Sequence, residues 1–292
     1  MCGLIDGYTL MHEHVTIDLS GIKQDQDCHL NCFEETVREF GQLYEYGVRN
    51  ILDVTNRGMG RDPEYIARVA EATGIQILLS TGFYKEPFLP REVYDSTPEE
   101  LAQLVEDELT KGIGTGTLRA SVIGEFGTSK DRMTPMEEKV FEAMALAAVR
   151  TGAPVTTHTT LGTYGREQLD YLTARGVKPE KVIIGHMDLS QDLGKILDIL
   201  NQGANVGFDT IGKLNYSPDT FRVEALKEID RQGLLSQVVL SMDITRKSHL
   251  RYQGGIGYGY LFEQFLPLLR EHGFTQKQID LLLIHNPKRI LG

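Results

Sequence analysis

The chain alternates short β-forming runs with amphipathic helical patterns along its whole length of 292 residues. Runs rich in Val, Ile, Leu and Thr predict eight strands, at residues 8–14, 50–55, 75–81, 120–125, 154–158, 181–186, 205–209 and 237–243. Apolar residues at helical spacing predict eight helices, at residues 32–46, 63–73, 98–112, 135–151, 166–175, 193–203, 219–232 and 260–273. Strict alternation of strand and helix predicts a parallel sheet, because parallel strands need helical crossovers.

Eight such units in 292 residues favour a closed (β/α)8 TIM barrel over an open sheet. A doubly wound sheet usually carries a glycine-rich turn after its first strand, whereas this first strand ends in His12-Glu13-His14. The glycine-rich segment 253–259 follows a loop instead, and we interpret it as a loop near the barrel mouth. No linker divides the chain, so we expect one α/β domain over residues 1–292, with its active site at the carboxyl ends of the strands.

The formal net charge of −11 argues against nucleic-acid and anionic-membrane partners, because both require a basic surface. No apolar run reaches the length of about 18 residues that a membrane span needs. The sequence has no basic segment followed by an apolar one, so we expect no signal peptide. We therefore expect a cytoplasmic protein, and a homodimer is compatible with the sequence.

Six side chains of metal-ligand type stand where predicted strands end. They are His12, His14, Glu125, His158, His186 and Asp243. A lone histidine at a strand end is more often an ordinary hydrogen-bonded residue, but these six come from five strands and would meet at one end of the barrel. The set is too large for one ion with an open position, so it predicts two metal ions that share a bridge.

Strand alternation predicts how these side chains point. Residues i and i+2 share a face, so His12 and His14 should point inward and Glu13 toward the helices. The same rule groups Ile123 with Glu125, and it groups Val239 and Ser241 with Asp243.

A division of ligands follows from this arrangement. We expect His12, His14 and Asp243 to bind one ion, His158 and His186 to bind the second, and Glu125 to bridge both. Two ions roughly 3.5–4 Å apart can hold a bridging hydroxide. Zinc lowers the pKa of bound water toward ~7, which favours Zn²⁺ as the ion. Asp243 is placed to accept the hydroxide proton and pass it to the leaving group. The residues thus predict a binuclear hydrolase.

Two other functions remain open at this point. A mononuclear, deaminase-like amidohydrolase would hold one ion tightly, use Glu125 as an acid or base, and leave His158 and His186 partly free. A metal-dependent binding protein would bind a small molecule without turnover.

Cys2, Cys28 and Cys32 are too few and odd in number for a disulfide framework in a chain this long. Cys28-His29-x-x-Cys32 could be half of a zinc site, but no second pair at ligand spacing accompanies it. We interpret these cysteines as ordinary loop and helix-start residues.

Several motifs together carry a family resemblance. They are TLMHEH at residues 9–14, GEFGTS at 124–129, TTHT at 156–159, GHMD at 185–188, SMDIT at 241–245 and NPKRIL at 286–291. On these motifs the chain resembles, over essentially its whole length, the phosphotriesterase-related branch of the amidohydrolase superfamily. The resemblance implies a metal-dependent hydrolase on a TIM barrel.

Two departures from that family matter for activity. Phosphotriesterases and related lactonases bridge their metals with a carbamylated lysine on the fourth strand, where this chain has Glu125, as one subgroup of the branch does. Its lactonases also carry an arginine after the aspartate of the seventh strand, whereas Thr210 follows Asp209 here. The resemblance therefore implies neither organophosphate triesterase activity nor lactone specificity.

Basic and polar residues just past the strand ends suggest the substrate. The candidates for substrate binding are Arg57, Arg61, Tyr84, Lys213, Arg246 and His249, with Lys85 and Lys247 nearby. Solvated loop charges are the alternative interpretation. Arg and Lys clamps favour a small anionic phosphoester, carboxylester or lactone over a neutral triester.

Overall fold

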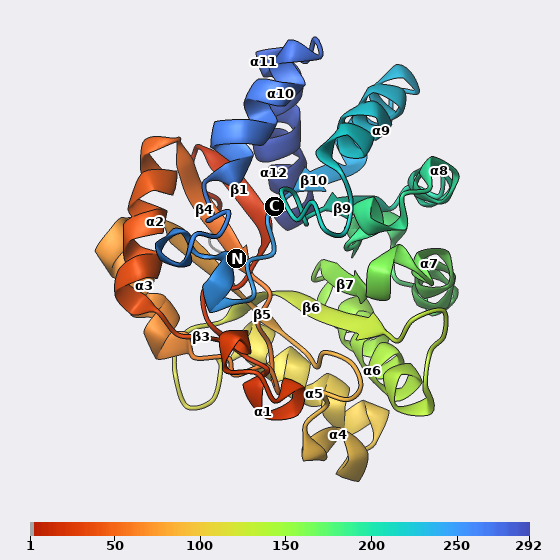
Figure 1. The fold of residues 1–292 in the computed structure, drawn as a ribbon. Coiled ribbons are helices and arrows are strands. Elements are labelled where there is room, and N and C mark those ends of the chain that lie inside the picture. Colours follow the sequence, from red (N-terminus) through yellow and green to blue (C-terminus); the bar gives the residue numbers. More distant parts are fainter. Residues whose placement is uncertain (1–2) are drawn as a thin grey trace.

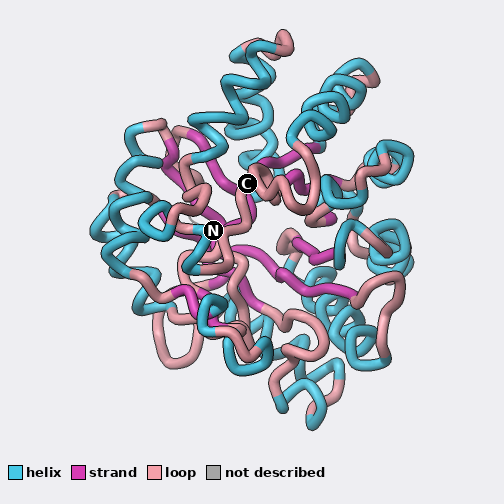
Figure 2. Tube along the Cα trace, in the orientation of Figure 1, coloured by secondary structure: helices cyan, strands magenta, loops and turns pink. Residues whose placement is uncertain are grey.

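The computed structural model describes residues 3–292, so Cys2 lies outside the described residues. Eight parallel strands form one sheet in the order β1-β4-β5-β6-β7-β8-β9-β10. They are β1 (Tyr8–Glu13), β4 (Val48–Asp53), β5 (Gln76–Thr81), β6 (Ala120–Thr128), β7 (Val155–Thr159), β8 (Val182–Ile184), β9 (Asn205–Phe208) and β10 (Val238–Leu240). The strands form a central ring with the helices outside it (Figure 1, Figure 2). This nearly closed barrel confirms the predicted (β/α)8 fold.

The outer layer contains the predicted helices. They are α2 (Phe33–Glu45), α3 (Pro63–Thr73), α5 (Pro98–Thr110), α6 (Pro135–Thr151), α7 (Gly165–Ala174), α8 (Leu193–Asn201), α9 (Asp219–Arg231) and a π-helical turn (Leu261–Phe265) that continues into α10 (Leu266–Glu271). Local sequence explains several boundaries. Thr97 and Thr134 form capping boxes with Glu100 and Glu137 at the starts of α5 and α6, and α6 ends at the left-handed Gly152.

Some short elements were not expected from the sequence. The loop after β1 contains β2 (Ile17–Asp18), α1 (Ser20–Lys23) and β3 (His29–Leu30), and α4 (Arg91–Asp95) follows β5. The chain ends in α11 (Gln276–Asp280), a π-helical turn (Leu281–His285) and α12 (Asn286–Leu291). No helix within residues 3–292 is both long and apolar enough to cross a membrane.

Side chains join the first strand to the last. Within the described chain no backbone ladder pairs β1 with β10. Instead, the backbone N–H of His12 donates to Ser241 Oγ at 3.0 Å. The Glu13 carboxylate accepts from Ser241 Oγ at 3.0 Å and from the N–H groups of Met242 and Ile244 at 2.7 and 3.2 Å. We call this set of bonds the β1–β10 seam.

Two apolar clusters lie on the two sides of the strands. The small cluster consists of strand residues closed off by chain-terminal ones: Met11, Leu52, Val54, Leu78, Val122, Ile183, Val239, Ile290 and Leu291, with Leu4 packed against them. It fills the inside of the barrel below the mouth, as side-chain layers do in TIM barrels. The large cluster includes strand and helix residues and forms the layer between the barrel and the helices.

Register shifts change which way side chains point. β6 carries one residue more than β7 between Ile123 and Phe126, and β1 has a similar shift relative to β4 within residues 10–13. Val122 lies in the inner cluster and Ile123 in the outer one, so the prediction that Ile123 shares a face with Glu125 is wrong. An extra residue of this kind re-aims the side chains that follow it. The prediction that the strand ends at Glu125 is also wrong, because β6 continues to Thr128.

Candidate metal centre

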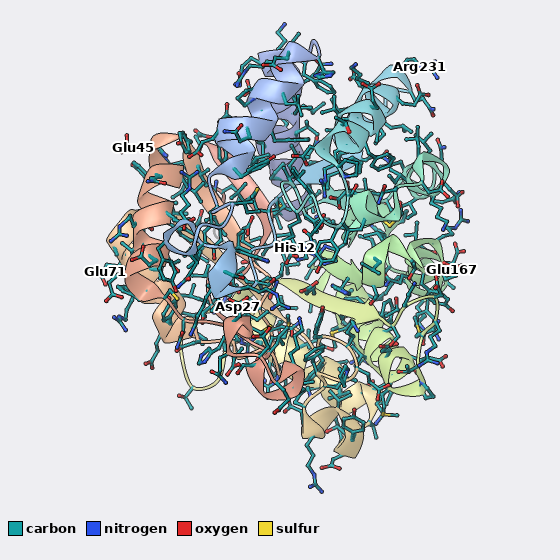
Figure 3. All side chains as sticks on the ribbon, viewed as in Figure 1. His12, Asp27, Glu45, Glu71, Glu167 and Arg231 are labelled. Atoms are coloured by element: carbon teal, nitrogen blue, oxygen red, sulfur yellow. The ribbon has the colours of Figure 1, made fainter. Side chains whose placement is uncertain are left out.

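The predicted ligands meet at the mouth of the barrel. His12 and Glu125 lie within β1 and β6, His14 directly follows β1, His158 lies in β7, and His186 and Asp243 follow β8 and β10. Figure 3 labels His12 near the middle of the ring of strands. The structure therefore brings together side chains that are up to 231 residues apart, from His12 to Asp243.

Glu125 is buried among four imidazoles. Its Oε1 lies 3.4 Å from His14 Nε2. Its Oε2 lies 3.2 Å from His158 Nδ1 and 3.6 Å from Nε2 of both His12 and His186. The two oxygens thus face different histidines, which is the arrangement that a bridging carboxylate requires.

Asp243 divides its two oxygens in a similar way. Its Oδ1 lies 3.4 Å from His14 Nε2 and 3.7 Å from His12 Nε2. Its Oδ2 accepts a hydrogen bond from the ammonium group of Lys213. One oxygen therefore faces the histidines of β1, and the other faces a cation of the cavity.

The donor atoms fit a divalent metal. Ligand atoms of His12, His14 and Asp243 lie within 4.8 Å of one another, and so do those of His12, Glu125 and His186. Both ring nitrogens of the buried His12 lack a hydrogen-bond partner among residues 3–292. Such a buried group calls for an explanation, and a bound cation supplies one. Imidazole and carboxylate groups are typical zinc ligands.

His158 belongs to neither of these two sets of three. Its Nδ1 nevertheless lies 2.9 Å from Nε2 of His186 and 3.2 Å from Glu125 Oε2. The structure therefore places His158 at the centre, and the ligand role of each of the six residues stays a prediction.

The carboxylates of the centre are held in their charged form. Burial alone would raise the pKa of Glu125, but the imidazoles around it outweigh burial and hold that pKa well below its usual range. Burial likewise opposes ionisation of Asp243, yet the Lys213 charge and the imidazole of His14 hold its pKa well below normal. Burial and the neighbouring His186 lower the pKa of His158 to about 4. By contrast, Asp243 and Glu125 outweigh burial and raise the pKa of His14 to about 9, and Asp209 raises the pKa of His186 well above its usual value. Metal binds anionic carboxylates and neutral imidazoles, so it would displace a proton from each of these two histidines.

Unusual backbone conformations aim the ligands. His186 and Asp243 have φ angles of 57° and 52°, in the left-handed region that non-glycine residues rarely adopt. Gly124, directly before Glu125, has a φ of 132°, and a Cβ atom there would lie 2.1 Å from the carbonyl oxygen of Thr156. Only glycine can therefore precede Glu125 at this close approach of two strands.

Asp209 is a residue of the centre that the sequence analysis missed. It directly follows β9 and is 1% exposed. Its Oδ1 lies 2.7 Å from His186 Nδ1 and accepts the backbone N–H of His186 at 3.0 Å, while its Oδ2 lies 3.4 Å from His12 Nδ1. Partners of this kind fix the orientation of metal-binding imidazoles. Its position at a strand end was the signal available in the sequence, and we applied that signal only to other residues.

A cavity of about 320 Å³ opens above the centre. Of the six predicted ligands, five line it, and of the six predicted substrate-binding residues, four do: Tyr84, Lys213, Arg246 and His249. The hydroxyl of Tyr84 lies 3.2 Å from His158 Nδ1. Arg246 is paired with Asp25 at 2.8 Å. These positions place the four residues within reach of a substrate.

Arg57 and Arg61 do not line this cavity, so the prediction that they bind substrate is corrected. Arg57 forms ion pairs of 2.8 Å with both Glu92 and Glu108. Arg61 is largely buried and pairs with Glu108 at 2.7 Å, and it also donates to the carbonyl oxygen of Ser80. Their guanidinium groups are used to hold the loop after β4 against α4, α5 and β5.

The segment that contains Cys28 and Cys32 leads into α2. Within residues 3–292, no group of three metal-type ligands includes Cys28, His29 or Cys32. Cys28 is buried in the outer apolar cluster, and Cys32 precedes α2 with its Sγ 3.4 Å from the Tyr252 hydroxyl. They are the loop and helix-start residues that we expected.

Comparisons with known proteins agree with this geometry. A profile described as the phosphotriesterase family matches residues 2–291. The phosphotriesterase homology protein of Escherichia coli (strain K12) is 47% identical over 283 residues, which cover 97% of each chain. A crystal structure of the Escherichia coli protein, complexed with phosphate in its active site, superposes with a TM-score of 0.96 at 46% identity and covers 98% of this chain and 99% of that one.

A more distant relative has a named activity. The phospho-furanose lactonase of Mycoplasmopsis synoviae (strain 53) is 27% identical over 312 residues, which cover 98% of this chain and 88% of the lactonase. The family profile, these relatives and the buried donor cluster agree in one conclusion. The chain belongs to the phosphotriesterase family and is a metal-dependent ester hydrolase.

Proposed function

We propose that the protein binds two divalent metal ions, with Zn²⁺ as the preferred ion, and hydrolyses an ester bond of a small anionic molecule. The observation that carries this proposal is the position of Glu125. Its two carboxylate oxygens face four imidazoles at 3.2–3.6 Å, with His14 on one oxygen and the other three on the second. A single ion would not require a carboxylate that is shared in this way.

We propose the following division of the ligands, in which His12 lies between the two ions because its ring also belongs to a group with Glu125 and His186. His12, His14 and Asp243 would hold one ion, His158 and His186 would hold the other, and Glu125 would bridge them. Asp209 orients one ring of each half, because its contacts with Nδ1 of His186 and His12 leave the Nε2 atoms of both rings directed at the carboxylates. When bound, the ions would polarise the ester and lower the pKa of water toward ~7.

Asp243 is the residue that we propose to move the proton. It is anionic, lies at the cavity wall, and contacts Lys213 through Oδ2. Its carboxylate would accept a proton from the attacking water and deliver it to the leaving group. The Lys213 ammonium fixes the orientation of this carboxylate and adds positive charge where an oxyanion develops.

The cavity supports a small substrate with negative charge. Its volume of about 320 Å³ is at the low end for small-molecule sites. Four cationic side chains line it, although the chain as a whole has a net charge of −11. The phosphate in the active site of the Escherichia coli structure and the phosphorylated substrate named for the lactonase support the same class. We propose a phosphoester, carboxylester or lactone, and not a neutral organophosphate triester.

The remaining expectations are proposals of the same kind. We propose a cytoplasmic enzyme with one domain that takes a small-molecule substrate and has no nucleic-acid or membrane partner. A homodimer is the oligomeric state that we propose to test first.

Metal content measured by plasma mass spectrometry tests the bridged centre. We expect about two zinc-type ions per chain in the wild type, purified without chelator, and a clear loss in Glu125→Gln. Glu39→Gln is the matched control, because Glu39 is also buried but hydrogen-bonds to backbone N–H groups of Arg251 and Tyr258. One ion or fewer in the wild type, unchanged by Glu125→Gln, would contradict the bridge and favour a mononuclear amidohydrolase.

A further inference from the structure

Two of the four cations that line the cavity form ion pairs with carboxylates, and two do not. Lys213 is paired with Asp243, and Arg246 is paired with Asp25 and Asp27. The other two cations are Lys23 and Lys85, and neither has a carboxylate within 4.0 Å among residues 3–292. We call Lys23 and Lys85 the unpaired lysines. Their positive charges are the ones available to a ligand.

The unpaired lysines lie beside two neighbouring aromatic rings, which are tilted by 39° to each other. Lys23 Nζ lies 5.8 Å from the centre of the Phe88 ring, and Lys85 Nζ lies 5.9 Å from the centre of the Tyr84 ring. The two ring centres are 5.6 Å apart. The hydroxyl of Tyr84 then reaches His158 of the metal centre at 3.2 Å. The Tyr84 side chain therefore stands between Lys85 and the metal centre, and the Phe88 ring stands between Lys23 and Tyr84.

The two lysines come from different loops. Lys23 ends α1, in the loop after β1, and is exposed, while Lys85 follows β5 and is half-buried. Figure 1 labels both α1 and β5 in the lower half of the view, below the centre of the ring. Lys85 donates to the carbonyl oxygen of Glu86 at 2.9 Å, which leaves two of its three N–H donors free for a ligand. Each ammonium group thus has donors to offer.

We propose that Lys23 and Lys85 form a subsite for a dianionic phosphate group that is remote from the scissile bond. Two ammonium groups match a charge of −2, whereas a carboxylate would neutralise only one of them. Phosphate also offers three acceptor oxygens to donors that approach from two loops. The enzyme then recognises its substrate at two ends, with the ester at the metal centre and the phosphate monoester at the unpaired lysines.

Calorimetric titration of the metal-loaded protein with propylphosphonate tests this subsite. The titration is carried out at a pH above the second pKa of the probe, where it is a dianion like a phosphate monoester. Its carbon–phosphorus bond leaves no ester to be hydrolysed. We expect its Kd to rise about tenfold in Lys23→Gln and in Lys85→Gln, and about 100-fold in the double variant. Lys→Arg at either position should restore much of the binding because it keeps the charge. Lys277→Gln, an exposed lysine of α11, is the matched control.

Several outcomes would overturn the subsite. They are no measurable binding of propylphosphonate to the wild type, an equal Kd in the wild type and the double variant, and equally tight binding of butyrate. An equal Kd would mean that the phosphonate binds at the metal ions instead. The inference rests on the proposed function for the position of the ester. Loss of the proposed function would appear separately, as an absence of ester hydrolysis with lysine-dependent binding intact.

Discussion

Replacing Asp209 with asparagine should weaken metal binding without touching a predicted ligand. The carboxylate holds His186 through Nδ1 at 2.7 Å and through the backbone N–H at 3.0 Å, and it lies 3.4 Å from Nδ1 of His12. Asparagine keeps one acceptor oxygen for His186. It presents a neutral amide to His12 in place of a negative charge, so both rings lose part of the interaction that orients them.

The size of the effect follows from these contacts. A hydrogen bond to a charged group contributes about 1.5–3 kcal/mol, compared with about 1 kcal/mol for a neutral one. Loss of an orienting partner of a metal ligand typically weakens metal affinity about 10- to 100-fold. The difference between the two kinds of bond, about 0.5–2 kcal/mol, overlaps the lower part of the second range, since a 10- to 100-fold change corresponds to about 1.4–2.8 kcal/mol. We therefore expect the zinc affinity of Asp209→Asn to fall within that range.

Competition with a coloured zinc chelator of known affinity measures this change directly. Glu39→Gln is the matched control, because Glu39 is also buried and accepts two backbone N–H bonds, from Arg251 and Tyr258. Its affinity for zinc should stay within about threefold of the wild type. An Asp209→Asn protein that binds zinc as tightly as the wild type would refute the orienting role, and so would an equal loss in Glu39→Gln.

Two further predictions concern glycine and buried charge. Gly124→Ala should lower the melting temperature and metal content together, because its Cβ would lie 2.1 Å from the carbonyl oxygen of Thr156; a variant with normal melting and metal content would contradict this. Glu108→Gln should lower the free energy of unfolding in urea at neutral pH by about 3 kcal/mol, because it removes the carboxylate that Arg61 pairs with. Burial opposes ionisation of Glu108, but Arg61, Thr81 and Arg57 hold its pKa below the usual value. The ionised carboxylate therefore stabilises the fold fully above pH ~4.5, and this stabilisation is lost as pH falls through the folded-state pKa. The stability of wild type and Glu108→Gln should therefore converge in acid, and a difference that persists there would contradict the ion-pair explanation.

The sequence predicted the barrel because its signals are local. Each strand is a run of β-forming residues, and several helix starts carry capping residues, as at Thr97 and Thr134. The metal-type side chains were found because a barrel of this kind gathers the ends of its strands at one mouth. Local rules could not place Glu125 within β6, because its inward direction depends on a register shift between two strands.

Charge pairing could not be predicted from the sequence either. Arg57 and Arg61 follow a strand end just as Lys213 does, yet Glu108, which neutralises both, lies 51 and 47 residues further along the chain. Pattern alone does not reveal which basic residue finds such a partner. The error for Asp209 was an omission. Its position at a strand end was recognisable in the sequence, but only its distances to the imidazoles of His186 and His12 show its role.

The β1–β10 seam has a consequence for the order in which the molecule can assemble. The bonds from Glu13 to Ser241, Met242 and Ile244 join positions 228, 229 and 231 residues apart. Contacts of such long range form late in folding, because much chain entropy is lost before they contribute. During synthesis, His12 and His14 leave the ribosome long before Asp243 does. The centre can therefore be completed only when nearly the whole chain has emerged, and a chain that stops before β10 would carry most of the ligands without being able to close around an ion.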